Sequence, residues 1–399
     1  MQTLAIVGAS LAGLSAARAA RAQGFGGRLV IIGDEQHRPY DRPPLSKDFL
    51  LGAITAEDLF LETPDDGLDA EWILGVSAVG LDAAGRTITL SDGRSLAADG
   101  IVIATGARSR KLPALEGLDN VSYLRTIADA EGLAPKLVAG NRMVIIGAGF
   151  IGAEAASVAA SRGMDVTMVD YARVPFAPQL GEDMGATVAK LHTARKVDLI
   201  CGAEIESFAI EDGHATALRL ADGRNLPADV VLVGIGAQPN VEWLEGSGVE
   251  LRNGVLCDAM GRTTAPGIVA VGDCANWFEL TLGEHRRVEH WTGALERPAV
   301  AVQALLDADA DAPEQPVKPP YFWSEQHGVK IQFAGHSAGY DRLVIEAGDP
   351  EEHNFLAVYY RGETPVAVLG MDQPRLFTKW RRSLSAAATK PAPLLATAS

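Results

Sequence analysis

The apolar and polar positions of the chain follow a pattern that occurs twice. Residues 4–13 read LAIVGASLAG and residues 143–152 read MVIIGAGFIG, and each is followed by an alanine-rich stretch and a second apolar run. The apolar runs have the length and β-branching of buried strands. Each copy therefore predicts a strand, a glycine-rich turn, a helix and a second strand, and the second strands end at residues 32–35 and 169–170.

A polar turn and a further apolar run complete each copy. Residues 92–99, DGRSLAAD, lead into IVIATGA at 101–107, and residues 222–229, DGRNLPAD, lead into VVLVGIGA at 230–237. An Asp-Gly pair between alternating apolar residues predicts a hairpin, and the run that follows it predicts a buried strand. The chain thus contains two copies of one βαβ, hairpin and strand unit.

The pattern changes after the second copy. Residues 263–273, which end in IVAVGD, predict a strand that belongs to neither copy, and a helix is expected over residues 293–306. The Ala-, Asp- and Pro-rich segment 307–320 predicts a linker. From Tyr321 onward a separate α+β domain is expected, with an Ala/Pro/Thr tail from about Ala386 that is predicted to be disordered. Its strands are expected at residues 330–334, 343–346, 356–360 and 366–370.

Composition narrows the class of protein. The 399 residues carry 35 Lys and Arg against 51 Asp and Glu, so the formal charge is −16, which argues against nucleic-acid binding. No uncharged stretch reaches the roughly 20 apolar residues that span a membrane. Cys201, Cys257 and Cys274 form no C-x-x-C pair, which argues against a disulfide framework, a thiol redox pair and a metal site. We therefore expect a cytoplasmic protein.

The two glycine-rich turns have the spacing of dinucleotide-binding motifs. Such a turn lets the backbone approach a pyrophosphate at a helix N-terminus, and an acid at the end of the next strand binds the adenosine ribose. The alternative, an ordinary tight turn, is disfavoured because both copies have the same strand, turn and helix setting. The first copy has Gly8, Ser10 and Gly13 with Asp34 or Glu35, and the second has Gly147, Gly149 and Gly152 with Asp170.

Two dinucleotide sites in one chain indicate two different dinucleotides, and the natural pair is a nicotinamide and a flavin. Further motifs are PYDRPPLSK at 39–47, ATGAR at 104–108, YLRT at 123–126, GIGAQPN at 234–240, AVGDCA at 270–275 and FWSEQ at 322–326. With these motifs the chain, up to about residue 382, resembles the FAD-dependent NADH:ferredoxin reductases that serve bacterial Rieske oxygenases and cytochromes P450. They belong to the wider glutathione-reductase-like flavoprotein group.

The resemblance implies an α/β protein with two Rossmann-like dinucleotide-binding domains, for FAD and NAD, and a C-terminal α+β domain. The FAD domain is expected in two segments, residues 1–110 and 239–315. The NADH domain is expected at residues 111–238, and the C-terminal domain with its tail at residues 316–399.

The same resemblance implies a set of residues around FAD. Residues 8–13 would hold the pyrophosphate, Lys47 would lie beside the flavin ring, and Asp273 would bind the ribityl or pyrophosphate region. Ordinary roles stay open, because Arg42 and Lys47 could be solvated loop charges, Asp273 a helix cap and Trp291 a core aromatic. The implied contacts are Gly8, Ser10, Leu11, Ala12, Gly13, Asp34, Glu35, Arg42, Lys47, Val79, Ala104, Thr105, Gly106, Arg125, Gly272, Asp273, Glu289, His290 and Trp291.

For NADH the resemblance implies contacts at Gly147, Gly149, Phe150, Ile151, Gly152, Asp170 and Gly236. Asp170 favours NADH over NADPH because a carboxylate there repels the 2′-phosphate, although Arg173 nearby could soften this preference. The implied catalytic residues are Lys47, Glu154 and Trp323. Glu154 would approach the nicotinamide and pair with Lys47, or it is simply an acid in a helix first turn. Trp323 would cover the nicotinamide side of the flavin, or it is a core tryptophan.

The implied reaction follows from electron counting. NADH gives up a hydride, whereas a [2Fe–2S] ferredoxin accepts single electrons, so FAD must stand between them. No cysteine precedes Cys201, which excludes the thiol chemistry found at the flavin of related disulfide reductases. The alternatives are a rubredoxin reductase, an NADH oxidase, or a redox-signalling flavoprotein that resembles apoptosis-inducing factor.

The basic residues near the C-terminus suggest where a ferredoxin would dock. Arg375, Lys379, Arg381 and Arg382 are the densest basic patch of an otherwise acidic chain. Ferredoxins are usually acidic, and local charge complementarity steers encounter even against an unfavourable net charge. A solvated helix face is the equally open alternative.

Overall fold

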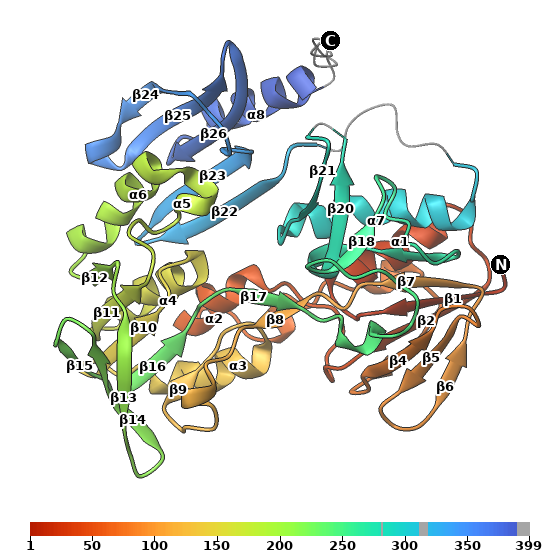
Figure 1. Ribbon diagram of the computed structural model, residues 1–399, viewed down its shortest axis with the longest axis horizontal. Helices are drawn as coiled ribbons and strands as arrows, with labels where there is room; N and C mark the ends of the chain where they lie inside the picture. Colours follow the sequence, from red (N-terminus) through yellow and green to blue (C-terminus); the bar gives the residue numbers. More distant parts are fainter. Residues whose placement is uncertain (281, 311–317, 389–399) are drawn as a thin grey trace, which may run out of the picture.

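The computed structural model describes residues 1–280, 282–310 and 318–388. Figure 1 shows two lobes joined by a narrow waist, with the C-terminal part lying over one of them. Residues 311–317 of the predicted linker and 389–399 of the predicted disordered tail lie outside the described residues. Among the described residues, no helix is long and apolar enough to cross a membrane.

The first copy of the repeat forms a five-stranded parallel sheet in the order β19-β7-β1-β2-β3. The strand predicted to belong to neither copy is β19, and it extends this sheet beside β7. The helix predicted over 293–306 begins two residues earlier, at Trp291. The elements are β1 (Thr3–Val7), α1 (Leu11–Ala22), β2 (Arg28–Gly33), α2 (Asp48–Leu51), β3 (Ala70–Leu74), β7 (Gly100–Ile103), β19 (Ile268–Ala270) and α7 (Trp291–Leu306).

The second copy forms a matching parallel sheet in the order β12-β11-β10-β16-β9. In both sheets the first strand of the copy lies between the second strand and the strand that follows the hairpin, so the sequence repeat is a structural repeat. Its elements are β9 (Val121–Ser122), α3 (Ile127–Leu133), β10 (Arg142–Ile146), α4 (Phe150–Ser161), β11 (Asp165–Asp170), α5 (Ala177–Leu180), α6 (Glu182–Ala194), β12 (Asp198–Cys201) and β16 (Val230–Val233).

Both predicted Asp-Gly turns join antiparallel strands, which confirms the hairpins. Small three-stranded sheets result, made of β4 (Ala78–Asp82), β5 (Thr87–Leu90) and β6 (Ser95–Ala97) in the first copy and β13 (Ile205–Glu211), β14 (His214–Leu220) and β15 (Asn225–Pro227) in the second. A third such sheet contains β18 (Val255–Cys257), β20 (Ala275–Glu279) and β21 (Glu284–Arg287).

The waist between the lobes is a two-stranded antiparallel pair. It consists of β8 (Ala107–Ser109) and β17 (Ala237–Pro239), where the chain crosses from one lobe to the other and back (Figure 1). The predicted domain boundaries at residues 110 and 238 fall at this pair and stay a prediction.

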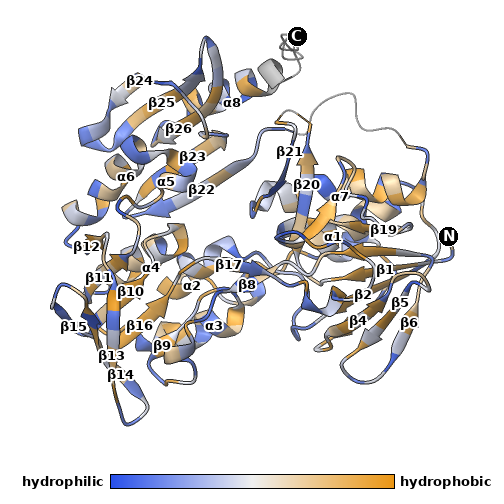
Figure 2. Cartoon of the chain, in the orientation of Figure 1, coloured by the Kyte–Doolittle hydropathy of each residue, from blue (hydrophilic) through white to orange (hydrophobic). Residues whose placement is uncertain are grey.

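The C-terminal part is an antiparallel sheet in the order β22-β23-β26-β25-β24, with α8 packed beside β26 and β23. All four predicted strands are present, and residues 386–388 of the predicted tail belong to α8. One apolar core joins this sheet to the second lobe, and Figure 2 shows apolar strands at the centre of both lobes. The elements are β22 (Tyr321–Gln326), β23 (Val329–Gly335), β24 (Arg342–Asp349), β25 (Asn354–Arg361), β26 (Thr364–Met371) and α8 (Pro374–Ala388).

Candidate functional site

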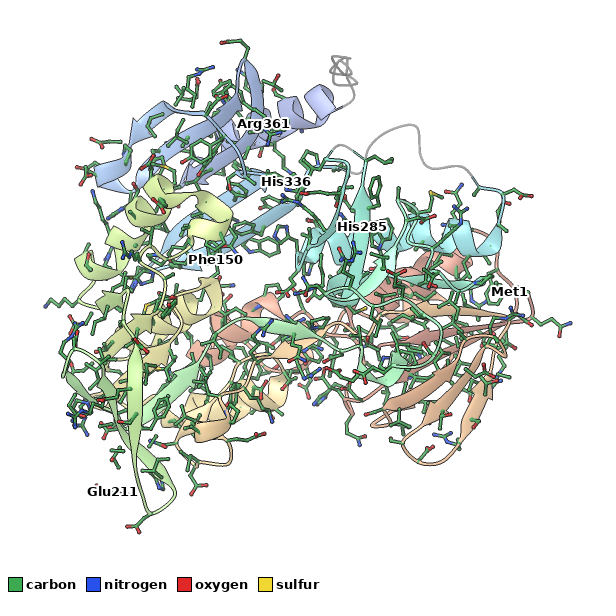
Figure 3. All side chains as sticks on the ribbon, viewed as in Figure 1. Met1, Phe150, Glu211, His285, His336 and Arg361 are labelled. Carbon is green, nitrogen blue, oxygen red and sulfur yellow. The ribbon has the colours of Figure 1, made fainter. Side chains whose placement is uncertain are left out.

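A cleft of about 1320 Å³ lies where the two lobes and the C-terminal sheet meet. Phe150 of the second lobe and His336 of the C-terminal part, both labelled in Figure 3, line it. The predicted site residues that line the cleft are Ser10, Leu11, Ala12, Arg42, Lys47, Ala104, Gly106, Arg125, Gly147, Gly149, Phe150, Ile151, Glu154, Asp170, Gly236, Gly272, Asp273, Glu289, His290, Trp291 and Trp323. Gly8, Gly13, Asp34, Glu35, Val79, Thr105 and Gly152 do not line it.

The first glycine of each turn permits a close approach of two strands. Gly8 has φ +126°, and a Cβ there would lie 2.0 Å from the carbonyl oxygen of Ala104. Gly147 has φ +102°, and its Cβ would lie 2.3 Å from the carbonyl oxygen of Gly234. Neither position accepts a side chain, so Gly147, which lines the cleft, and Gly8, which does not, both depend on the absence of a Cβ.

The middle position of each turn opens toward the cleft. A Cβ added at Gly149 would meet no atom within 4 Å, so the N-terminus of α4 faces free space. Ser10 occupies the same position before α1, and its side chain makes no capping hydrogen bond. Free backbone N–H groups at a helix N-terminus bind phosphate. Both turns therefore fit the pyrophosphate of a dinucleotide.

The two acids that end the second strands have different partners. Asp170 accepts hydrogen bonds from the backbone N–H of Ala148 (2.6 Å) and of Ala172 (2.7 Å), which holds its carboxylate at the edge of the cleft. Glu35 instead accepts from Arg42 (2.6 Å) and from the hydroxyl of Tyr40 (2.5 Å). The sequence did not decide between Asp34 and Glu35 as the acid that binds the ribose. In the structure Glu35 is hydrogen-bonded to Arg42, which lines the cleft, whereas Asp34 is exposed.

A chain of charges continues from Glu35 into the cleft. Arg42 also donates to the carbonyl oxygen of Arg125 (2.9 Å), and Arg125 donates to Asp273 (2.6 Å). The carboxylate of Asp273 is thereby paired with a guanidinium. Arg125 Nε and His290 Nδ1 are buried without a partner. Arg125 and His290 line the same cleft as Ser10 of the first glycine turn, so these unpartnered polar atoms fit a polar ligand such as FAD.

The predicted pair of Lys47 and Glu154 forms. Lys47 Nζ lies 3.0 Å from Glu154 Oε2, and the side chains are 14% and 6% exposed. Two serines that sequence reasoning missed also donate to this carboxylate: Ser46, and Ser324 at 2.7 Å. Both stand inside motifs already singled out, at 39–47 and 322–326. Glu154 therefore joins three separate segments beside the cleft.

Aromatic side chains close the cleft on the side of the C-terminal sheet. Trp291 and Trp323 meet edge to face, with ring centroids 5.8 Å apart, and Tyr321 stacks on Trp323 at 5.9 Å. Trp291 Nε1 donates to Asp41 (2.8 Å), a residue to which sequence reasoning gave no role. Burial raises the pKa of Asp41. These rings line a cleft, so neither tryptophan is a plain core residue.

Two predicted positions have surroundings that the sequence did not indicate. Val79, implied to contact FAD, is 53% exposed and lies at a register shift of β4 between Ala78 and Gly80, and its contact with FAD stays a prediction. Arg381, predicted to belong to a basic docking patch, is half-buried with its guanidinium 4.2 Å over the ring of Tyr321. The other three cations, Arg375, Lys379 and Arg382, are exposed on α8.

Comparison with known proteins identifies the family. Residues 2–297 match the family model of the pyridine nucleotide-disulphide oxidoreductases. The chain belongs to this family. Residues 321–399 match a second model, the reductase C-terminal domain.

This family member is similar over most of its length to ferredoxin reductases. It is 34% identical to putidaredoxin reductase of Pseudomonas putida, over 95% of this chain and 91% of that protein. It is 37% identical to the ferredoxin reductase component of a chlorobenzene dioxygenase of Cupriavidus sp. (strain PS12), over 98% of this chain and 94% of that protein. A crystal structure of a covalent putidaredoxin reductase–putidaredoxin complex superimposes with a TM-score of 0.91 at 34% identity. The match covers 97% of this chain and 93% of that chain.

The family name refers to disulphide chemistry, but none of the three cysteines of this oxidoreductase is among the residues that line the cleft. Cys257 and Cys274 are buried in the core of the first lobe, and Cys201 is half-buried at the end of β12. Burial raises the pKa of all three thiols. A thiol whose pKa is raised carries little reactive thiolate, so this member lacks the means for disulphide exchange at the cleft.

Proposed function

We propose that this chain is an NADH:ferredoxin reductase that holds FAD and passes the electrons of NADH to a [2Fe–2S] ferredoxin of an oxygenase or cytochrome P450 system. The observation that carries this function is the single cleft that both glycine turns line, with the pair of Lys47 and Glu154 inside it. The ferredoxin reductases to which the chain is similar support the acceptor. Its three free cysteines are compatible with a cytoplasmic location, which is part of the proposal.

The first glycine turn is proposed to hold FAD. The N-terminus of α1 at Ser10 faces the pyrophosphate, while Arg125, held by Asp273, supplies positive charge beside it. Lys47 and Trp291, which is fixed by Asp41, would hold the flavin ring. FAD accepts a hydride and returns electrons singly, which is the conversion that a one-electron acceptor requires.

The second glycine turn is proposed to hold NADH. Gly149 leaves room for the pyrophosphate at the N-terminus of α4, and the carboxylate of Asp170 would accept hydrogen bonds from the ribose hydroxyls. Two hydrogen bonds from the backbone fix that carboxylate, so it repels a 2′-phosphate from a constant position. Glu154 and Phe150 line the cleft on the same helix and orient the nicotinamide.

The ferredoxin is proposed to dock on α8. Arg375, Lys379 and Arg382 are spaced four and three residues apart, so they form one stripe on the helix. All three are exposed. The stacked rings of Trp323 and Tyr321 lead from the cleft toward this helix, where Tyr321 meets Phe377. A docked acidic ferredoxin would thus lie close to the aromatic wall of the cleft.

Turnover with different acceptors tests this function. The purified flavoprotein is mixed with NADH and either a [2Fe–2S] ferredoxin, a rubredoxin or oxygen alone, and NADH oxidation is followed at 340 nm. We expect fast turnover only with the ferredoxin. Fast turnover with rubredoxin or with oxygen would instead establish a rubredoxin reductase or an NADH oxidase. A long-lived complex with NADH and no active acceptor would favour a redox-signalling protein.

A further inference from the structure

A line of hydrogen bonds, most of them buried, leads away from Glu154 through residues that do not line the cleft. Ser324 Oγ donates to Glu154 Oε1 (2.7 Å), and Gln326 Nε2 donates to Ser324 Oγ (3.0 Å). Gln326 Oε1 lies 3.0 Å from His192 Nε2, and His192 Nδ1 lies 3.1 Å from His327 Nε2. We name Ser324, Gln326, His192 and His327 the donor chain.

The donor chain connects three elements that are distant in the sequence. Ser324 and Gln326 are alternate residues of β22 and so point to the same face of the sheet. His192 lies in the last turn of α6, and Glu154 lies on α4. Figure 1 shows β22 beside these two helices. The chain therefore ties the C-terminal sheet to the second lobe at the point where Glu154 faces the cleft.

The carboxylate of Glu154 fixes the direction of every bond. A carboxylate can only accept hydrogen bonds. Ser324 therefore donates its one hydroxyl proton to Glu154 and must accept the hydrogen bond from Gln326. The amide oxygen of Gln326 then faces His192, which must donate from Nε2 and accept at Nδ1 from His327. Reversing the amide of Gln326 would demand a second proton from Ser324. Only one arrangement satisfies all the groups.

Burial supports this arrangement. Ser324, Gln326 and His192 are fully buried, so an unpaired polar atom in any of them would be costly. Burial, with His327 next to it, lowers the pKa of His192 to about 4. Burial, with Arg195, lowers the pKa of His327 to about 4 as well. Both imidazoles are thus neutral at neutral pH, and each has the one donor and one acceptor that the chain requires.

We propose that the donor chain is a positioning device for the reaction: it holds the carboxylate of Glu154 in the one orientation that pairs it with Lys47 at the flavin. This inference rests on the proposed function. The amide of Gln326 lies in the middle of the chain, and an amide does not pass a proton onward as a hydroxyl or imidazole does. The donor chain orients Glu154 and does not conduct protons to it.

Removal of one hydroxyl tests the proposal. Ser324→Ala deletes the donor to Glu154, and Ser122→Ala is the control, because Ser122 is also a buried serine on a strand but bonds Lys136 (3.1 Å). FAD reduction is measured by stopped flow at saturating NADH. We expect Ser324→Ala to slow it by about tenfold to a hundredfold, as a displaced reacting group does. The control should keep its rate, and Ser324→Thr, which retains the hydroxyl, should recover most of it.

The melting temperature, measured beside the rate of FAD reduction, distinguishes a positioning role of the donor chain from a purely structural one. Both alanine variants should lower the melting temperature. Ser324→Ala leaves the buried amide nitrogen of Gln326 without its acceptor, and Ser122→Ala removes one of the two hydrogen bonds that Lys136 Nζ donates. If Ser324→Ala loses stability like Ser122→Ala but reduces FAD at the normal rate, the donor chain is only structural and the proposal is wrong. A change in the NADH concentration for half-saturation without a change in rate would also contradict it.

A second readout needs neither NADH nor a ferredoxin. In holoprotein labelled with ¹⁵N-histidine, the proposal expects low-field imidazole N–H signals from His192 Nε2 and His327 Nε2. Gln326→Met should abolish the first signal, and Ser122→Ala should leave both. Signals from the Nδ1 atoms instead would overturn the direction of the chain. Because this result is independent of turnover, it stands or fails separately from the proposed function.

Discussion

The two copies of the repeated unit share a backbone and differ in how they use the acid that ends the second strand. In the first copy Glu35 is bound to Arg42 and Tyr40, within the loop that carries Lys47. In the second copy the partners of the Asp170 carboxylate among the described residues are backbone N–H groups. We interpret the first arrangement as a site built around a resident cofactor, and the second as a site for a ligand that comes and goes.

The largest expected effect comes from the first glycines. Gly8→Ala places a Cβ against the carbonyl of Ala104, and should lower the free energy of unfolding by on the order of 3 kcal/mol and remove FAD. Gly147→Ala makes the matching clash in the second copy, and should keep the flavin while weakening NADH binding. The ratio of flavin to protein absorbance, followed by NADH titration, measures both. Loss of flavin only in Gly147→Ala would reverse the assignment of the two copies.

Acid should lower the free energy of unfolding through His192, which lies in α6 of the second lobe. Its folded pKa of about 4 is below the unfolded value of 6.5. Its contribution to stability is therefore complete above about pH 6.5 and is lost as the pH falls toward 4, up to about 3 kcal/mol. Chemical denaturation at several pH values, for the wild type and His192→Gln, measures this. Equal slopes of unfolding free energy against pH in the two proteins would contradict it.

A smaller effect is expected from Asp170. Asp170→Asn removes the charge that repels a 2′-phosphate, so kcat/KM for NADPH relative to NADH should rise about tenfold, or about 1.4 kcal/mol. Arg173→Ala is the matched variant, because it removes a nearby cation and should sharpen the preference for NADH. Steady-state kinetics with both nucleotides measure the two ratios. An unchanged ratio in Asp170→Asn would remove the role given to this carboxylate.

The smallest effect is expected from the stripe on α8, which concerns the second electron transfer and not the first. Arg375→Glu with Lys379→Glu should raise the KM for ferredoxin severalfold at low salt and flatten its dependence on salt. The rate of FAD reduction by NADH should not change. Arg219→Glu, at an exposed position of β14, is the control. If the double variant reduces ferredoxin with wild-type salt dependence, the docking proposal is wrong.

The sequence predicted the features that depend on local patterns. Both glycine turns, both hairpins and the four C-terminal strands follow from short periodicities, since strand alternation and turn chemistry are set by neighbouring residues. The resemblance implied Lys47 as a partner of Glu154, but local sequence did not reveal Ser324. Ser324 lies far from Glu154 along the chain, and only packing of the C-terminal sheet on the second lobe brings the two together.

The surroundings of two predicted residues did not follow from the sequence, because the exposure of a side chain depends on local geometry and not on its position in a motif or a charge cluster. Val79 lies at a register shift in β4, and Arg381 lies over Tyr321 on the inner side of α8. The choice between Asp34 and Glu35 was equally open in the sequence, because both follow the same strand.

The central claim is that one cleft brings two different dinucleotides together. Anaerobic titration of the purified protein with NADH, followed by its absorption spectrum, tests this most directly. We expect a bound flavin, bleached in full by about one equivalent of NADH, and a much slower response to NADPH. A protein without a flavin spectrum, or a flavin that NADH does not bleach, would contradict it.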